Sequence, residues 1–206
     1  MGVDAQLQDR KALLTLPVAY VVWAFAFQGV VLDFWIRITI ATLVLLTLAL
    51  VFGRREMDLR PKLVPVAIGL ASAVLLYLFF WSGYQVMKGV PGFTGTISSV
   101  YALRSAEPVS VIALVLLFPI GPTEEIYWRG FIQRYLSNRM SSRNSILLTS
   151  TLYGFLHLPT LNPSLILVAF IGGLVWGYLY SRFGLSAAMS SHILWDEMIF
   201  VFFVIS

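Results

Sequence analysis

Long apolar runs dominate the chain and limit what it can fold into. The run at 63–87 carries no charged residue, and the run at 34–52 carries one, Arg37. A helix needs about 20 apolar residues to cross the hydrocarbon core of a bilayer. The chain is 59% hydrophobic and 12% charged, whereas about 25% of the residues of a soluble domain are charged. The sequence therefore predicts an all-α, polytopic transmembrane helical bundle.

We expect about seven spans in a single transmembrane domain that covers residues 1–206, with a motif-bearing catalytic core at 108–200. The spans are predicted at roughly 12–32, 34–52, 63–87, 108–136, 146–158, 163–181 and 186–205. Residues 88–107 are expected to form a loop with a short surface helix. Gly173 and Gly177 are four apart and predict close helix packing. We expect most of the six tryptophans to face lipid or the membrane interface.

The basic residues predict an orientation, because short cytoplasmic loops of membrane proteins are enriched in Lys and Arg. With the N-terminus in the cytoplasm, ten of the fourteen basic residues fall inside: Arg10, Lys11, Arg54, Arg55, Arg60, Lys62, Arg134, Arg139, Arg143 and Arg182. Three fall outside, at Arg37, Lys88 and Arg104, and Arg129 lies within the membrane. We therefore expect a multi-pass protein of the cell (plasma) membrane. The net charge of +4 has a topological explanation, so no nucleic-acid partner is predicted.

Three charged residues, Glu124, Glu125 and Arg129, interrupt the fourth apolar run. Ionisable groups at membrane depth are energetically expensive and indicate a functional site. Pro119 and Pro122 break the backbone ladder just before them, so Glu124 is expected in the first turn of a new helical segment. Glu125 lies four residues before Arg129 and can pair with it. Glu124 points about 100° away and stays free to face a cavity.

The two histidines of the chain, His157 and His192, also fall in apolar helices. Asp196 follows His192 by four residues, so the two side chains share one helix face. With a rise of 1.5 Å per residue, His157, His192 and Glu124 lie roughly 17, 9 and 20 Å from the cytoplasmic ends of their helices. We therefore expect a polar cavity in the cytoplasmic half. The absence of cysteine excludes thiolate zinc sites and cysteine nucleophiles.

Taken in order, these motifs resemble the CPBP family of intramembrane glutamic-type endopeptidases. The family comprises type II CAAX prenyl endopeptidases and bacteriocin-processing relatives. The resemblance rests on Glu124-Glu125-x-x-x-Arg129, on a histidine in the next helix, and on His192-x-x-x-Asp196. The second motif of the family usually begins with Phe, where this chain has Tyr153, and the third often ends in Asn, where this chain has Asp196.

The resemblance implies peptide-bond hydrolysis in the membrane on a membrane-associated protein or peptide, without a metal or other cofactor. A carboxylate and a histidine can activate a water as a general base, and by resemblance these are Glu124 and His157. His192 and Asp196 are the second polar cluster, which can stabilise an oxyanion. Because ionised Asp has no proton to donate, Asp196 is either protonated or orients His192. Glu125 and Arg129 are expected to hold the first motif in place.

Two other classes remain open at this stage. In a zinc-dependent membrane protease, Glu124, His157 and His192 are the ligands, since two histidines and a carboxylate form a workable catalytic set. No His-Glu-x-x-His motif is present. In a non-enzymatic immunity or transport protein, the same residues form a structural polar network or a proton relay. The substrate also stays open between a prenylated tail, a leader peptide and a sorting tag.

Overall fold

The computed structural model of the chain describes residues 3–53 and 57–205, with side chains from residue 12 onward. This part of the chain is helical and contains no strand, which confirms the predicted fold class. The α-helices are α1 (Val3–Gln28), α2 (Phe34–Gly53), α3 (Leu63–Met87), α4 (Phe93–Tyr101), α5 (Val109–Val115), α6 (Gly121–Glu125), α7 (Arg134–Ser137), α8 (Ser142–Leu156), α9 (Pro163–Phe183) and α10 (Leu185–Glu197).

Short 3₁₀ and π segments connect or extend several of these helices. The 3₁₀ segments are η2 (Ala102–Ala106) and η5 (Leu158–Thr160), and the π segments are η3 (Leu116–Ile120), η4 (Ile126–Gln133) and η6 (Met198–Phe202). The segments η3 and η4 join α5, α6 and α7 into one helical stretch, Val109–Ser137. The region predicted as a loop with a surface helix contains α4 and η2.

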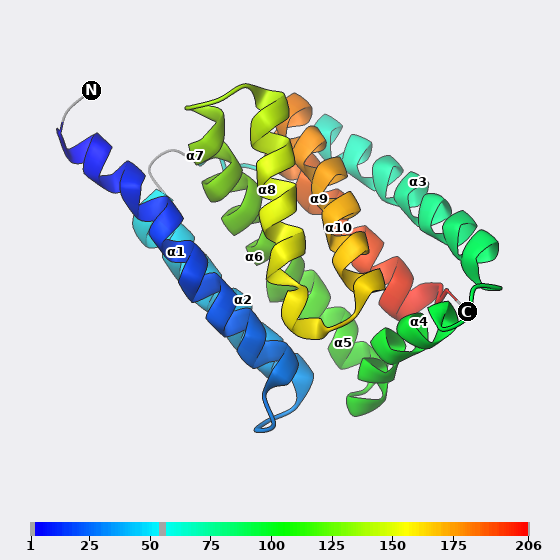
Figure 1. The fold of residues 1–206 in the computed structure, drawn as a ribbon. Helices are drawn as coiled ribbons and strands as arrows, with labels where there is room; N and C mark the ends of the chain where they lie inside the picture. The colour runs from blue at the N-terminus through cyan, green and yellow to red at the C-terminus, as the bar shows by residue number, and fades with distance from the viewer. Residues whose placement is uncertain (1–2, 54–56, 206) are drawn as a thin grey trace.

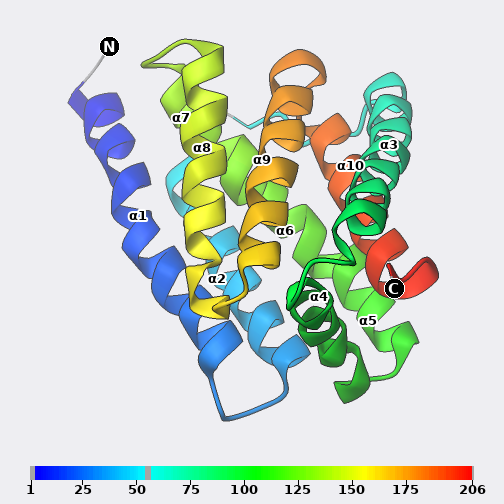
Figure 2. The same ribbon diagram turned by 45° about the vertical axis from the view of Figure 1, so that its right-hand side comes forward.

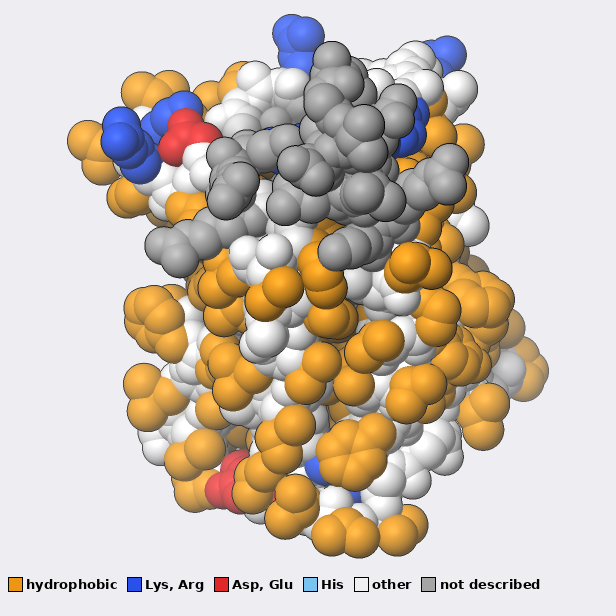
Figure 3. Space-filling model, turned by 90° about the vertical axis from the view of Figure 1, so that its left-hand side faces the viewer, with side chains coloured by type: hydrophobic (Ala, Val, Ile, Leu, Met, Phe, Trp, Pro, Cys, Tyr) orange, Lys and Arg blue, Asp and Glu red, His pale blue; other side chains and the backbone are white. Residues whose placement is uncertain are grey.

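The helical stretches lie side by side, as Figures 1 and 2 show. Four of them are long and apolar enough to cross a membrane: α2, α3, Val109–Ser137 and α9. Each of the seven predicted spans coincides with a helical stretch, since α1, α8 and α10 with η6 account for the other three. In the view of Figure 3, a wide band of hydrophobic side chains covers the face below an end where Lys and Arg gather.

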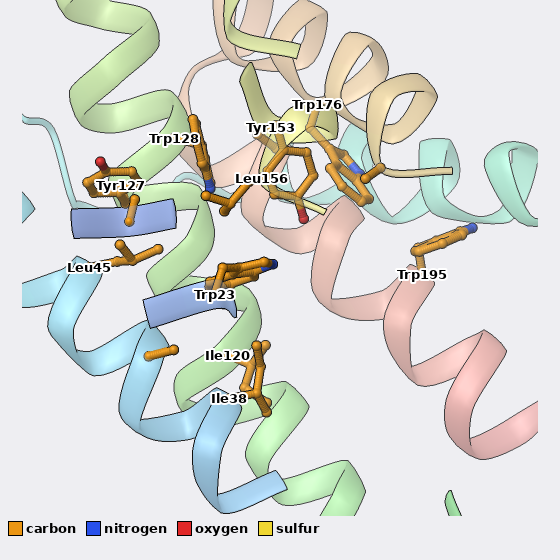
Figure 4. Packing of buried hydrophobic residues seen from close by; sticks show 14 of the residues in the cluster. Trp23, Ile38, Leu45, Ile120, Tyr127, Trp128, Tyr153, Leu156, Trp176 and Trp195 are labelled. Carbon is orange, nitrogen blue, oxygen red and sulfur yellow. The ribbon is translucent and has the colours of Figure 1, made fainter. Parts of the chain in front are cut away.

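The bundle core is built around tryptophan, contrary to the expectation that most tryptophans face lipid. Trp81 is 44% exposed, but five tryptophans are at most 5% exposed: Trp23, Trp35, Trp128, Trp176 and Trp195. Figure 4 shows four of these in the core, with Trp128 and Trp176 on either side of Tyr153. Large rings are needed there because the interior must be filled to crystal-like density around a few polar groups. Hydropathy alone does not distinguish a tryptophan of the bundle core from one that anchors a helix at the membrane interface.

Small residues allow the closest helix contacts. A Cβ added at Gly69 of α3 would lie 2.3 Å from the carbonyl oxygen of Ala187 in α10. A Cβ added at Gly173 of α9 would lie 3.1 Å from the Cα of Ser150 in α8, and one at Gly177 would lie 2.9 Å from the Gln133 side chain. The predicted packing role of Gly173 and Gly177 is therefore confirmed, and α9 is held tightly against α8 and η4.

Helix α8 is short, with 15 residues, which corresponds to a length of roughly 22 Å. The turn that follows it is anchored by polar contacts. Asn162 donates from Nδ2 to the carbonyl oxygen of Thr96 (2.7 Å) and to Oγ of Ser99 (2.9 Å), both in α4. Gln28 of α1 donates to the carbonyl oxygen of Pro159. The bundle thus satisfies the backbone of this turn internally.

The bundle has two chemically different ends. The basic end comprises the connection at 57–62, the α7–α8 connection and the α9–α10 turn; the first and third are joined by Ser186 Oγ, which donates to the carbonyl oxygen of Arg60 (3.2 Å). Arg54 and Arg55 lie outside the described residues. The far end comprises the α1–α2, α3–α4 and α8–α9 connections. Figure 1 shows the α7–α8 connection and the start of α1 at the top, opposite the C-terminus.

Candidate active site

A break in the Val109–Ser137 stretch places Glu124. Phe118 leaves helical geometry, with φ −150° and ψ 115°, directly before Pro119. Helix α6 then begins at Gly121, and Glu124 lies in its first turn, as the proline pattern predicts. The Glu124 carboxylate is 5% exposed and accepts a hydrogen bond from the Tyr153 hydroxyl at Oε2 (2.6 Å). The Tyr153 hydroxyl does not engage the other carboxylate oxygen, Oε1.

Glu125 has a different environment, because two cationic or proton-donating groups converge on it. Arg129 donates from Nη1 to Oε1 of Glu125 (2.6 Å), and both side chains are fully buried. His192 approaches the same oxygen through Nδ1 (2.8 Å). The Arg129 guanidinium also lies 5.0 Å from the ring centre of Tyr153 and 5.3 Å from that of Trp176. The predicted Glu125–Arg129 pair is present, and it extends to His192.

His157 is the C-cap of α8, and its ring has a defined polarity. Its Nδ1 lies 2.8 Å from the carbonyl oxygen of Tyr153. A carbonyl only accepts, so Nδ1 carries the proton and Nε2 has the free lone pair. The ring is enclosed by aromatic side chains at centroid distances of 5.8 Å for Trp23, 6.1 Å for Phe27 and 4.9 Å for Tyr153. Packing therefore fixes the direction in which Nε2 points.

His192 is held on three sides. Its ring stacks on Trp176 with a centroid distance of 3.7 Å and an interplanar angle of 18°. Its Nδ1 contacts Glu125, and its Nε2 lies 3.5 Å from Oδ2 of Asp196, a distance at the outer limit of a hydrogen bond. Trp176 comes from α9, where it lies beside Tyr153 in Figure 4. The ring of His192 thus has little freedom to turn.

One cavity of about 420 Å³ brings these residues together. Glu124, His157, His192 and Asp196 all belong to its wall, although they come from separate stretches of the chain. Glu125 and Arg129 do not line it. The rest of the wall is mainly aromatic and aliphatic, including Trp23, Phe80, Ile120 and Leu165. The arrangement is a largely apolar cavity with carboxylates and imidazoles at its inner end.

The position of this cavity disagrees with part of the sequence interpretation. Its wall extends from Glu124 toward the far end, to Phe34, Met87 and Ile205, and not toward the basic loops. A cavity in the cytoplasmic half and basic loops in the cytoplasm are therefore incompatible predictions. The estimated depths, roughly 17, 9 and 20 Å for His157, His192 and Glu124, placed the polar groups in the cytoplasmic half. The predicted span at 146–158 ends close to the observed end of α8 at Leu156, but the depths did not show that the open space lies beyond that end.

Two residues of the site escaped the sequence interpretation. Tyr153 was noted only as a replacement for Phe, but its hydroxyl holds Glu124. It lies four residues before His157 and so shares a helix face with it, which is a usable signal. Trp176, the ring on which His192 stacks, was covered only by the expectation that most tryptophans face lipid or the membrane interface. Its position between two close-packing glycines, Gly173 and Gly177, indicates a buried place.

The zinc alternative has little geometric support. Within the described residues, no group of three or more acidic or histidine side chains is arranged to hold a metal ion. The two ring nitrogens of His192 already contact Glu125 and Asp196.

A comparison with family models identifies the chain. Residues 106–198 match the model described as Rce1-like, type II CAAX prenyl endopeptidase Rce1-like. This motif-bearing part of the chain belongs to the CAAX protease family. No curated protein and no solved structure matches it. The match contains all six candidate residues, and membership in the CAAX protease family makes the chain an integral membrane protein and a protease of this type.

Proposed function

We propose that the chain is an intramembrane glutamic-type endopeptidase that hydrolyses a peptide bond of a membrane-associated protein with a water activated by Glu124 and His157. The observation that carries this proposal is the shared cavity wall of Glu124, His157, His192 and Asp196. These four side chains are the polar groups at the inner end of an otherwise apolar cavity. A carboxylate and an imidazole on one cavity supply a general base and a second group that orients the water.

The chemistry follows from the hydrogen bonds already made. Tyr153 occupies Oε2 of Glu124, so Oε1 accepts the proton of the attacking water. Nε2 of His157 accepts a hydrogen bond from the other water proton, because its Nδ1–H is directed to a backbone carbonyl. The water oxygen attacks the carbonyl carbon of the substrate. Glu124 then returns the proton to the leaving amine as the carbon–nitrogen bond breaks.

The negative charge that develops on the carbonyl oxygen needs a donor. His192 directs Nδ1 to Glu125, and its Nε2 edge lies at the cavity beside Asp196. A ring that carries protons on both nitrogens donates Nδ1–H to Glu125 and Nε2–H to the oxyanion. Asp196 then orients the His192 ring at Nε2. Glu125, itself paired with Arg129, holds the ring at Nδ1.

The same contacts explain why Glu124 is the base in this proposal. Glu125 is bound by Arg129 and His192 through one oxygen and lies outside the cavity wall. A carboxylate engaged by a guanidinium is a poor proton acceptor, and one that is turned away from the cavity does not reach the water. Glu124 is not engaged by a guanidinium, and it lines the cavity.

The decisive experiment is the substitution Glu124→Gln, which keeps the size of the side chain and removes its basicity. Membranes of cells that express the parent and the variant are compared by proteomics, and a precursor that accumulates with the variant is then tested with purified protein. We expect cleavage to fall by at least about a hundredfold, the usual effect of removing a general base. Glu197→Gln is the matched control, because Glu197 is a buried acid of α10 outside the cavity wall.

Near-parental cleavage by Glu124→Gln would remove Glu124 from the mechanism. Loss of activity with a chelator, and its recovery with zinc, would support the metalloprotease alternative. The identified precursor also decides between a prenylated tail, a leader peptide and a sorting tag. The matching family, type II CAAX prenyl endopeptidases, favours the first of these.

We also propose that the protein lies in the plasma membrane with its N-terminus in the cytoplasm. The support is the distribution of Lys and Arg along the sequence and the position of the connections that carry most of them. The 57–62 and α9–α10 connections meet at the basic end, where the first turn of α1 also lies (Figure 1).

A further inference from the structure

A second cavity, which we call the basic cavity, lies at the basic end and apart from the candidate site. Its volume is about 430 Å³, within the range of about 300–1,000 Å³ that is usual for small-molecule sites. Its wall comes from the 57–62 connection, from η4 and α7, from the first turn of α8, and from the turn between α9 and α10. Among the described residues, none lines both this cavity and the cavity of Glu124. A ligand of the basic cavity would therefore occupy a separate site.

The wall of the basic cavity carries an excess of positive charge. Among its described lining residues, Arg60, Lys62 and Arg134 are cationic and Asp58 is acidic. Asp58 contacts Lys62, with Oδ2 and Nζ 2.8 Å apart, so these two charges offset one another. Arg60 and Arg134 supply the excess. A guanidinium presents several N–H groups in a planar fork, which matches the oxygens of a phosphate group.

Neutral hydrogen-bond donors surround the same space. The hydroxyl groups of Ser142, Tyr180 and Ser181 belong to lining residues. Oγ of Ser181 accepts a hydrogen bond from Nε2 of Gln133 (3.1 Å), which leaves its own O–H to donate. Helix α10 also begins in the wall, with Gly184 as its N-cap. The positive end of the helix dipole favours an anion there and adds to the effect of the two arginines.

The rim of the basic cavity is apolar on the side of the membrane spans. Helix α3 begins directly after Lys62 with Leu63 and Val64, which are 90% and 70% exposed. Phe183, near the end of α9, lines the cavity and is 37% exposed. Both helices are long and apolar enough to cross a membrane, so these side chains lie where the spans begin. Basic pockets between spans at this depth bind the headgroups of anionic lipids in membrane proteins.

We propose that the basic cavity binds a phosphate group, carried by an anionic phospholipid or by a soluble phosphate compound. Two arginines, several hydroxyl groups and a helix N-terminus supply donors for its oxygens. The exposed apolar side chains beside the cavity favour the phospholipid, because its acyl chains would cover them. The site does not depend on the reaction at Glu124, so it can exist whether or not the proposed mechanism is correct.

The first test measures how tightly the purified protein retains lipid in detergent, by native mass spectrometry. The probes are dioleoylphosphatidylglycerol and dioleoylphosphatidylcholine, which have the same acyl chains and differ in headgroup charge. We expect the parent to retain phosphatidylglycerol more tightly. Arg60→Gln and Arg134→Gln should each weaken this retention by about tenfold, the effect of losing a hydrogen bond to a charged group. Because Arg60 is exposed, its variant should fold normally.

Arg182→Gln is the matched control for these variants. Arg182 is an exposed arginine at the same end of the bundle, and it does not line the basic cavity. The substitution changes the net charge by the same amount, so we expect unchanged retention of phosphatidylglycerol. Equal weakening by Arg182→Gln and Arg60→Gln would contradict the proposal, because it would assign the attraction to the charge of the whole end.

The source of the phosphate is decided with probes that have no acyl chain. Binding of inorganic phosphate and of glycerol phosphate is measured by titration calorimetry on the parent, on Arg60→Gln and on Arg182→Gln. If these probes bind with the same dependence on Arg60, and the two lipids are retained equally, the site stands and its ligand is a soluble phosphate compound. Equal retention of the two lipids, with no binding of either soluble probe, contradicts the proposal.

A second test locates the bound group. The chain has no cysteine, so single cysteines report without background. Ser142→Cys places a thiol in the cavity wall, and Asn138→Cys places one at an exposed position of the same connection outside the wall. Both variants are labelled with an uncharged maleimide in phosphatidylcholine nanodiscs, with and without phosphatidylglycerol or glycerol phosphate. We expect the better-bound probe to slow labelling of Ser142→Cys only; slowing at both positions, or at neither, would place the ligand elsewhere.

Discussion

The buried pair of Glu125 and Arg129 gives the sharpest prediction on stability. Both side chains are fully buried and are joined at 2.6 Å, and Glu125 has His192 as its second partner. Arg129→Met removes the guanidinium from above the rings of Tyr153 and Trp176. It also leaves the buried Glu125 carboxylate with His192 as its one remaining partner, without water to replace the guanidinium.

We expect Arg129→Met to lower the free energy of unfolding by about 3–5 kcal/mol, the usual effect of removing one partner of a buried ion pair. Replacing both partners behaves differently, because no buried charge is then left alone. The double variant Glu125→Gln/Arg129→Met should therefore recover most of the loss, since exchange of a whole buried pair is often near neutral.

The measurement is unfolding of the purified protein in mixed micelles at increasing fractions of a denaturing detergent. Tryptophan fluorescence is a suitable signal because five of the six tryptophans are buried. Unfolding curves of the parent, of Glu125→Gln, of Arg129→Met and of the double variant form a thermodynamic cycle. A single variant as stable as the parent, or a double variant no more stable than Arg129→Met, would falsify the assignment of this pair as a structural anchor.

Three further outcomes are expected. Tyr153→Phe removes the hydrogen bond to Glu124, worth about 1.5–3 kcal/mol to a charged group, so cleavage should fall and the free energy of unfolding should fall by up to that amount. Asp196→Asn should retain cleavage, because the amide oxygen can still orient the neighbouring imidazole and the amide NH₂ can still donate to an oxyanion; loss of cleavage would show that the carboxylate charge itself is required, and rates across a pH series check this. Gly69→Ala should destabilise the protein, because the new Cβ meets the backbone of α10, whereas Gly83→Ala should not, because it meets nothing within 4 Å.

The polar residues of the candidate site could be identified from the sequence. Charged residues at membrane depth are rare, so Glu124, Glu125 and Arg129 stood out against an apolar background. The i,i+4 spacing also anticipated the ion pair and the neighbouring positions of His192 and Asp196. These are short-range relations along one helix, and helix geometry alone determines them.

The aromatic surroundings and the direction of the opening were not predictable in this way. Stacking of His192 on Trp176 joins α10 to α9, and the hydrogen bond from Tyr153 to Glu124 joins α8 to α6. Both depend on the rotation of one helix against another, which hydropathy leaves undetermined. The side on which the cavity opens depends on how the helices pack beyond the end of α8, and the predicted span at 146–158 gives that end closely without determining the packing.

The length of α8 has a consequence for the bilayer itself. At roughly 22 Å the helix is shorter than the hydrocarbon core, which is about 30 Å thick. The membrane adapts to such hydrophobic mismatch by local thinning. Such thinning would bring the headgroups and the water layer closer to the α8–α9 turn and to His157, the C-cap of α8. The thickness of the host membrane would then determine how much water reaches the site. Bilayers of longer acyl chains should therefore slow the reaction without any change in the protein.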